Sequence, residues 1–95
     1  MLSMPLSRII EVVCASYEIE LTELSQRGSR HPARAGLVYL ARSHSLATNA
    51  ELAAVLGLSR AESVPNLTRR FSDWLSAEAK VRRQLRELEE VLQWR

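Results

Sequence analysis

The sequence has few of the residues on which β-rich folds depend. Aromatic residues make up 5% of the chain, and there are only three glycines and three prolines. Small β-sandwiches and barrels need frequent turns and aromatic side chains, so this composition disfavours them. Hydrophobic residues at 46% and charged residues at 25% are ordinary for a globular protein and disfavour a disordered chain. We therefore expect an all-α fold.

Cysteine is limited to Cys14, so no disulfide can form within the chain. Cys14 lies in an apolar run and is expected to be a small core residue. No apolar stretch reaches the roughly 18 residues of a membrane span, and the first residues lack the pattern of a signal peptide. These absences predict a cytoplasmic protein with no membrane partner.

The length also excludes several classes of protein. Ninety-five residues suffice for one compact domain, and we expect residues 1–95 to form it, because two independent cores need a longer chain. An enzyme with its own cofactor domain is excluded. The apolar residues recur at helical spacing, which predicts five or six helices.

The first predicted helix covers residues 7–17, with Ser7 as its N-cap. A short turn over 20–24 is expected to direct Leu21 and Leu24 inward. A long helix over 32–43 follows, with Pro32 in its first turn. The residues that it is expected to bury are Leu37, Val38, Leu40 and Ala41.

Residues 49–75 have the pattern of a helix-turn-helix. Asn49 is a suitable N-cap for a short helix over 50–56, and Gly57 follows where a left-handed residue usually ends a helix. The alternative is an ordinary helical hairpin in a small bundle. The apolar residues placed to pack within the unit are Leu52, Ala53, Leu56, Leu58, Val64 and Leu67.

The second helix of this unit has two possible starts. Ser59 and Glu62 fit a capping box, which would place Pro65 inside the helix and kink it. With Ser63 as the N-cap, Pro65 would lie in the first turn, where proline is tolerated. The sequence leaves both starts open. The apolar residues expected to face inward are Val64, Leu67 and Phe71, followed by Trp74 or Leu75.

The basic residues concentrate in the middle of the chain. Residues 27–60 contain five arginines and one acidic residue, Glu51. All basic residues except Lys80 are arginines, whose planar guanidinium suits bidentate contact with phosphates and base edges. We expect a polar loop over about 25–34 in which Arg27 and Arg30 are exposed.

The chain from Leu40 to Leu92 resembles the C-terminal duplex-DNA-binding domain of the bacterial replication initiator DnaA, an all-α fold similar to the Trp repressor. The resemblance is carried by Ala50-Glu51-Leu52, by Leu56-Gly57 and by Arg69-Arg70-Phe71. Upstream, residues 24–30 resemble the basic loop of that domain, and Arg34 takes the position of a basic residue at the next helix start. The resemblance implies duplex DNA as the partner.

One segment departs from DnaA. Where DnaA has an Asp-His-Thr-Thr run, this chain has Arg60-Ala61-Glu62-Ser63. The variant pattern from Gly57 to Phe71 is similar to the DnaA-like domain at the C-terminus of tyrosine transposases associated with repetitive extragenic palindromes. This second resemblance implies that the chain is the DNA-recognition module of a transposase.

Base contacts are expected from the outward side of the reading helix near its start. Arg60 could bind guanine, Asn66 could pair with adenine, and Glu62 could either accept from cytosine or serve as a helix cap. Arg69 and Arg70 are expected at phosphates. The full set of expected DNA-contacting residues is Arg27, Arg30, Arg34, Ser59, Arg60, Glu62, Ser63, Asn66, Arg69 and Arg70.

Catalysis, a metal and a cofactor are not expected from this chain. His31 and His44 lie thirteen residues apart without nearby ligands, and no glycine-rich phosphate loop is present. The transposases named above have a separate nuclease domain with a His-hydrophobic-His motif and a nucleophilic tyrosine. No His-x-His occurs here, and Tyr17 and Tyr39 have apolar neighbours typical of packing residues.

Two alternatives to DNA recognition remain open. The apolar stripe of a terminal helix beginning near Ser76 could dock a partner or a second copy, although core packing inside the chain is the favoured explanation. Structured RNA is the other possible partner, and competition between duplex DNA and RNA hairpins would distinguish it. The residues of the docking hypothesis are Val81, Leu85, Leu88, Leu92 and an exposed Trp94.

Overall fold

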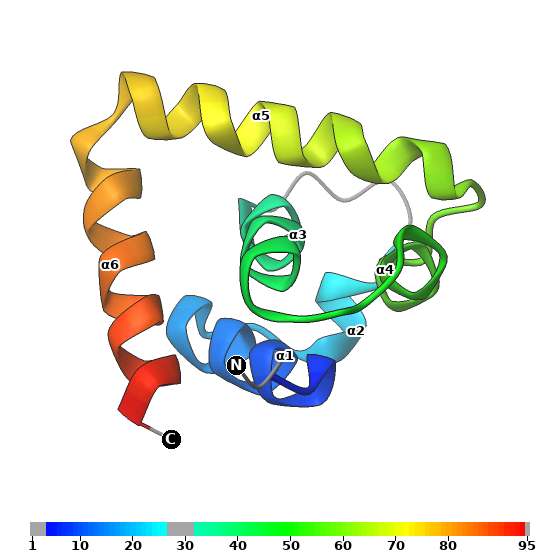
Figure 1. The fold of residues 1–95 in the computed structure, drawn as a ribbon, viewed down its shortest axis with the longest axis horizontal. Helices are drawn as coiled ribbons and strands as arrows, with labels where there is room; N and C mark the ends of the chain where they lie inside the picture. Colours follow the sequence, from blue (N-terminus) through cyan, green and yellow to red (C-terminus); the bar gives the residue numbers. More distant parts are fainter. Residues whose placement is uncertain (1–3, 27–31, 95) are drawn as a thin grey trace.

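A computed structural model describes residues 4–26 and 32–94, which contain six α-helices and no strand (Figure 1). The all-α prediction is confirmed. Arg27 and Arg30 lie outside the described residues, as does His31. The helices are α1 (Leu6–Tyr17), α2 (Leu21–Leu24), α3 (Pro32–His44), α4 (Asn49–Leu56), α5 (Val64–Ala77) and α6 (Ala79–Trp94), with a 3₁₀ turn, η1 (Ala61–Ser63), before α5.

Helix α3 is the centre of the fold. Figure 1 looks along it, with α5 passing over one side and α1 lying on the other. All four residues predicted to be buried on α3 are fully buried. Removing each of Leu37, Val38 and Leu40 from water contributes roughly 1.5 to 3 kcal/mol, and the smaller Ala41 contributes less. The partners that complete this core include Ile9 and Val13 of α1, Leu52 and Leu56 of α4, Val64 of α5, and Leu88 and Leu92 of α6.

The first two helices differ from the predictions at their ends. Helix α1 begins at Leu6 with Pro5 as its N-cap, so Ser7 is not the cap. Leu24 is fully buried as predicted, but Leu21 is 54% exposed and the inward prediction for it is wrong. Because α2 is a single turn, only its C-terminal end reaches the core.

Helix α4 is capped by Thr48 rather than by Asn49. The Thr48 hydroxyl accepts from the Glu51 amide at 3.1 Å, and the Glu51 carboxylate accepts from the Thr48 amide at 2.7 Å. Thr48 has a glutamate three residues later, which allows this reciprocal capping box. The Asn49 side chain instead accepts a hydrogen bond from Arg42 at 2.6 Å.

Helix α5 has the later of the two possible starts, the one with Ser63 as the N-cap. Ser63 is its N-cap and Pro65 lies in the first turn, so no backbone hydrogen bond is lost to the proline. The alternative start, with a capping box between Ser59 and Glu62, does not occur, because residues 61–63 form the 3₁₀ turn and Arg60 precedes it as the N-cap. Of the residues expected to face inward, Val64 and Phe71 are buried, and Leu67, Trp74 and Leu75 are partly buried.

Helix α6 begins at Ala79, three residues after the predicted start near Ser76. Glu78 has an extended backbone that ends α5, and Arg82 donates to the Leu75 carbonyl at 2.5 Å. Leu88 and Leu92 are buried, while Val81 and Leu85 are partly buried. The stripe therefore packs inside the chain, as the packing interpretation predicted. The side chain of Trp94 is outside the described residues.

Cys14 and the tyrosines pack against the core. Burial, and secondarily the carboxylate of Glu20, raise the pKa of the Cys14 thiol, and burial also raises the pKa of Tyr17. The ring of Tyr39 lies 5.1 Å from that of Phe71 between centroids. These contacts agree with packing roles for the two tyrosines.

Candidate nucleic-acid interface

Helices α4 and α5 and the turn between them form one packed unit. Leu52, Ala53 and Leu56 of α4 are buried together with Val64 at the start of α5. Figure 1 looks down α3 and α4, whereas α5 runs across the picture and over both. Residues 57–63, which include Gly57 and η1, connect the two helices, so the element order is that of a helix-turn-helix with a connection longer than the usual three or four residues.

Gly57 fixes the turn. Its φ of 68° is left-handed, as predicted, and the Leu58 amide after it donates to the Ala53 carbonyl at 2.9 Å. A Cβ atom at Gly57 would collide with the backbone carbonyl oxygen of Ser25. The chain segment that leads into the predicted basic loop is therefore packed directly against the turn of the unit.

Arg34 corrects the predicted interface. It was expected to contact DNA, but its side chain is only 4% exposed and it donates to the carbonyl oxygen of Leu56 at 2.7 Å. That carbonyl belongs to the last turn of α4, where carbonyl groups lack helical partners and the helix dipole attracts a positive charge. Arg34 therefore joins α3 to the end of α4, and its burial leaves no surface for a phosphate.

The surroundings of Arg34 are unfavourable for its charge. Burial, and after it the positive charge of Arg70, lower the pKa of the Arg34 guanidinium. An arginine remains protonated at neutral pH despite such a shift. Arg70 on α5 is itself exposed, so a positive charge is presented to solvent above the buried one.

The outward side of α5 is polar near its start. Asn66, Arg69 and Arg70 are exposed, while Val64 and Phe71 on the inward side are buried. The exposed Asp73 follows one turn further along. The predicted side chains Asn66, Arg69 and Arg70 are thus brought together on one accessible surface.

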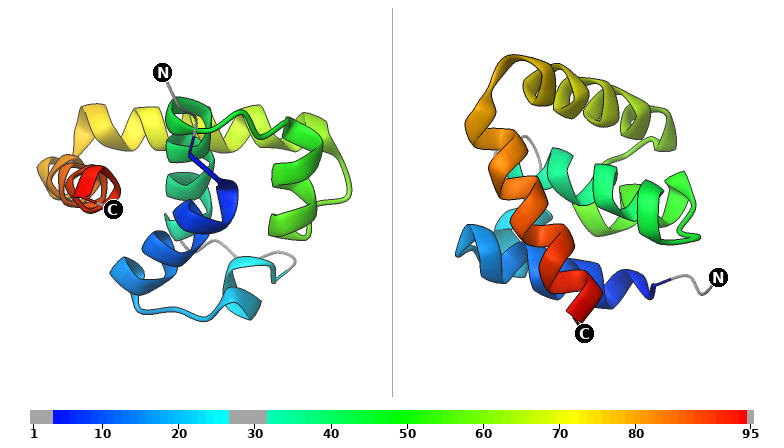
Figure 2. Two further views of the ribbon diagram at one scale, coloured as in Figure 1. Left: turned by 60° about the horizontal axis from the view of Figure 1, so that its bottom comes forward. Right: turned by 60° about the vertical axis from the view of Figure 1, so that its left-hand side comes forward.

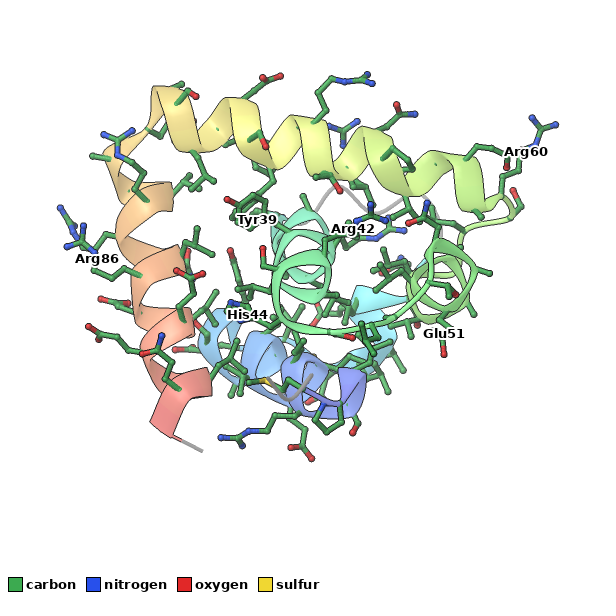
Figure 3. All side chains as sticks on the ribbon, in the orientation of Figure 1. Tyr39, Arg42, His44, Glu51, Arg60 and Arg86 are labelled. Carbon is green, nitrogen blue, oxygen red and sulfur yellow. The ribbon has the colours of Figure 1, made fainter. Side chains whose placement is uncertain are left out.

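The residues before α5 are also accessible. Ser59, Arg60 and Glu62 are exposed and Ser63 is partly buried. Figure 3 shows Arg60 next to the N-terminal end of α5, pointing away from the body of the molecule. Because Ser59 is not a helix cap, the capping role considered for Glu62 is wrong, and its carboxylate faces solvent.

Arg42 is a candidate that the sequence reasoning left out of the site. It is exposed in the last turn of α3 and donates a hydrogen bond to the Asn49 side chain at the start of α4. The sequence showed it only as one member of the basic stretch. No spacing signal predicts a hydrogen bond between side chains on two different helices seven residues apart.

Metal chemistry has no support in the described part of the chain. No group of three or more histidine, cysteine or acidic side chains gathers there. His44 contacts Glu89 of α6 at 3.3 Å, which joins the end of α3 to the terminal helix. None of the described helices combines the length and the apolar character that crossing a bilayer requires.

Comparisons of this chain with protein-family models, with curated proteins and with solved structures found no match. The resemblances to the DnaA domain and to the transposase domain therefore stand on the residues quoted for them.

Proposed function

We propose that this chain binds duplex DNA in a sequence-specific manner, with the first half of α5 in the major groove. The observation that carries the proposal is the outward side of α5, where Asn66, Arg69 and Arg70 are exposed together on a helix whose other side is anchored in the core. A rigid helix with polar side chains near its start is the usual reader of a helix-turn-helix.

The exposed side chains have the chemistry of base-edge recognition. The Asn66 amide can bond to adenine in a bidentate manner, and Arg60 can do so with guanine. Glu62, no longer needed as a cap, is free to accept from the amino group of cytosine. Each such contact is worth about 1 to 3 kcal/mol of discrimination between bases.

Arg69 and Arg70 are suited to phosphate contacts that position the helix. The repulsion that Arg70 exerts on Arg34 would be reduced by a phosphate anion at the α5 surface. Each neutralised phosphate adds about 0.9 to the logarithmic dependence of the binding constant on salt. Arg27 and Arg30 of the basic loop are proposed as further contacts on the ground of the sequence alone.

Transposition as the biological setting is supported by the sequence resemblance between Gly57 and Phe71. In that setting the chain is the recognition module and contains no catalytic residue. The observation that tests it is the open reading frame around these residues, because a nuclease domain upstream would indicate a transposase and an ATPase domain an initiator.

The direct test is selection of binding sites from a randomised pool of duplex DNA, with RNA hairpins as competitors. We expect an enriched motif, displacement by duplex DNA and not by hairpins, and affinity that falls steeply with salt. Failure to enrich any motif would show that α5 is not a sequence reader. Preference for the hairpins would replace the proposal with RNA binding.

Docking through the apolar stripe of α6 is not favoured as an alternative function. Leu88 and Leu92, which would have to reach a partner, are 1% and 2% exposed.

A further inference from the structure

Helix α6 has an unusual order of charges. Its first half contains Lys80, Arg82, Arg83 and Arg86, and its second half contains Glu87, Glu89 and Glu90. A helix dipole favours acidic residues near the N-terminus and basic residues near the C-terminus, so this order opposes the dipole. An intrahelical ion pair is also weaker when the basic residue is N-terminal to the acidic one than in the reverse order. The stability of the isolated helix therefore does not explain the arrangement.

The charges of both halves lie on one exposed side of α6. Leu88 and Leu92 point into the core, and at about 100° per residue Arg83, Arg86, Glu87 and Glu90 fall on the opposite side. The side chains of these four residues are exposed and make no hydrogen bond or ion pair within the described part of the chain.

The position of α6 leaves this side uncovered by the other described helices. The helix runs along the edge of the molecule, with α1 and α5 only on its inner side (Figures 1 and 2). Figure 3 shows Arg86 pointing away from the body of the molecule.

We propose that this side of α6 pairs with α6 of a second copy of the chain in an antiparallel arrangement. A two-fold axis between positions 86 and 87 places Arg83 of one copy opposite Glu90 of the other, and Arg86 opposite Glu87. The symmetry of a dimer makes each contact twice. The antiparallel arrangement also sets the two helix dipoles against each other, which is favourable.

A shallow groove beside this side of α6 supplies apolar surface. It lies between α1 and α6 and has a volume of about 530 Å³. Of the apolar side chains in its lining, Ala15 and Val91 are exposed, whereas Val12 and Leu88 are buried. Val91 at its edge is 50% exposed. Exposed ion pairs give orientation more than affinity, so the dimer is a weak one whose formation depends on concentration and on salt.

The test is sedimentation equilibrium without DNA, on the wild type and on two charge-reversed variants. The variant R83E/R86E makes the four positions all acidic, and E87R/E90R makes them all basic. We expect the wild type to associate at concentrations approaching about 1 mM and either variant alone to associate at least about tenfold more weakly. An equimolar mixture of the two variants should recover the association, because the pairs form again between unlike chains.

A matched control reverses two other exposed arginines. R69E/R70E on α5 should leave the association unchanged, and circular dichroism should show equal helix content in all variants. A wild type that remains monomeric throughout, or a mixture that fails to recover association, would overturn the proposal. Because no DNA is present, either outcome leaves the proposed DNA binding untouched.

Discussion

The first halves of α3 and α5 both contain arginines, yet these arginines have opposite surroundings. Arg34 near the start of α3 is buried and bonded to the Leu56 carbonyl, whereas Arg69 and Arg70 on α5 are exposed. A guanidinium can serve a helix end as well as a phosphate, because both present oxygen acceptors to it. The residue type alone therefore does not distinguish a structural arginine from a binding one.

The two regions meet at the end of α4. Leu56 binds Arg34 of α3, and Gly57 turns the chain toward α5 against the backbone of Ser25. The buried contacts of Arg34 and Gly57 fix the turn, and the turn sets the position of α5. Substitutions at these buried contacts should lower stability, and substitutions on the exposed side of α5 should lower DNA recognition.

The largest effect is expected for Gly57→Ala. The left-handed backbone penalises a side chain, and the added Cβ would collide with the Ser25 carbonyl, so we expect a loss of about 2 to 4 kcal/mol in the free energy of unfolding. Chemical denaturation measures it. Gly36→Ala is the matched control, because its Cβ would lie 3.3 Å from the Tyr17 hydroxyl, without a collision with backbone, in a helix that favours alanine. Equal losses in both variants would contradict the role given to the turn.

Arg34→Ala should destabilise the fold by about 2 kcal/mol. The substitution leaves the buried Leu56 carbonyl without its donor and removes the packed stem of the side chain. Denaturation and DNA binding should be measured on the same sample. If stability is unchanged and DNA binding is weakened, the result would support the DNA contact that the sequence predicted for Arg34.

Asn66→Ala should leave stability within about 0.5 kcal/mol of the wild type, because the side chain is exposed. Preference at one base pair should fall by about 1 to 3 kcal/mol in the site-selection experiment. Ser72→Ala, exposed on another side of α5, is the control and should keep the motif. If the motif survives in both variants, Asn66 is not a base contact.

The smallest effect is expected for Arg70→Ala. Affinity should decrease about equally for all sequences, and the logarithmic salt slope should fall by about 1, because one phosphate contact is lost. Lys80→Ala on α6 removes the same charge from a residue outside the proposed DNA-contacting set and should leave the slope unchanged. A change of motif in Arg70→Ala would instead assign Arg70 to base recognition.

Much of the fold could be predicted because its signals are local. The helical spacing gave α3 and its four buried residues, and the left-handed turn at Gly57 followed from glycine after an apolar helix end. The N-cap residues were harder to predict, because adjacent residues can each serve as the cap. Thr48 is the cap of α4, since only it has Glu51 three residues later and since Asn49 is held by Arg42.

The candidate site was predicted in part for a similar reason. Exposure of Asn66, Arg69 and Arg70 follows from the helical period once Val64 and Phe71 face the core. The sequence left the start of α5 open between Ser59 and Ser63, because a capping box and a proline gave opposing local preferences. Packing of Val64 into the core accompanies the later start.

The sequence by itself determined the class of fold, the order of the helices and the polar side of α5, because these depend on residues within a few positions of each other. Only the tertiary structure decided that Arg34 is buried and that Leu21 is exposed. The hydrogen bond of Arg34 joins residues twenty-two positions apart. Such a contact depends on how α3 and α4 pack, and no periodicity along the chain specifies that packing.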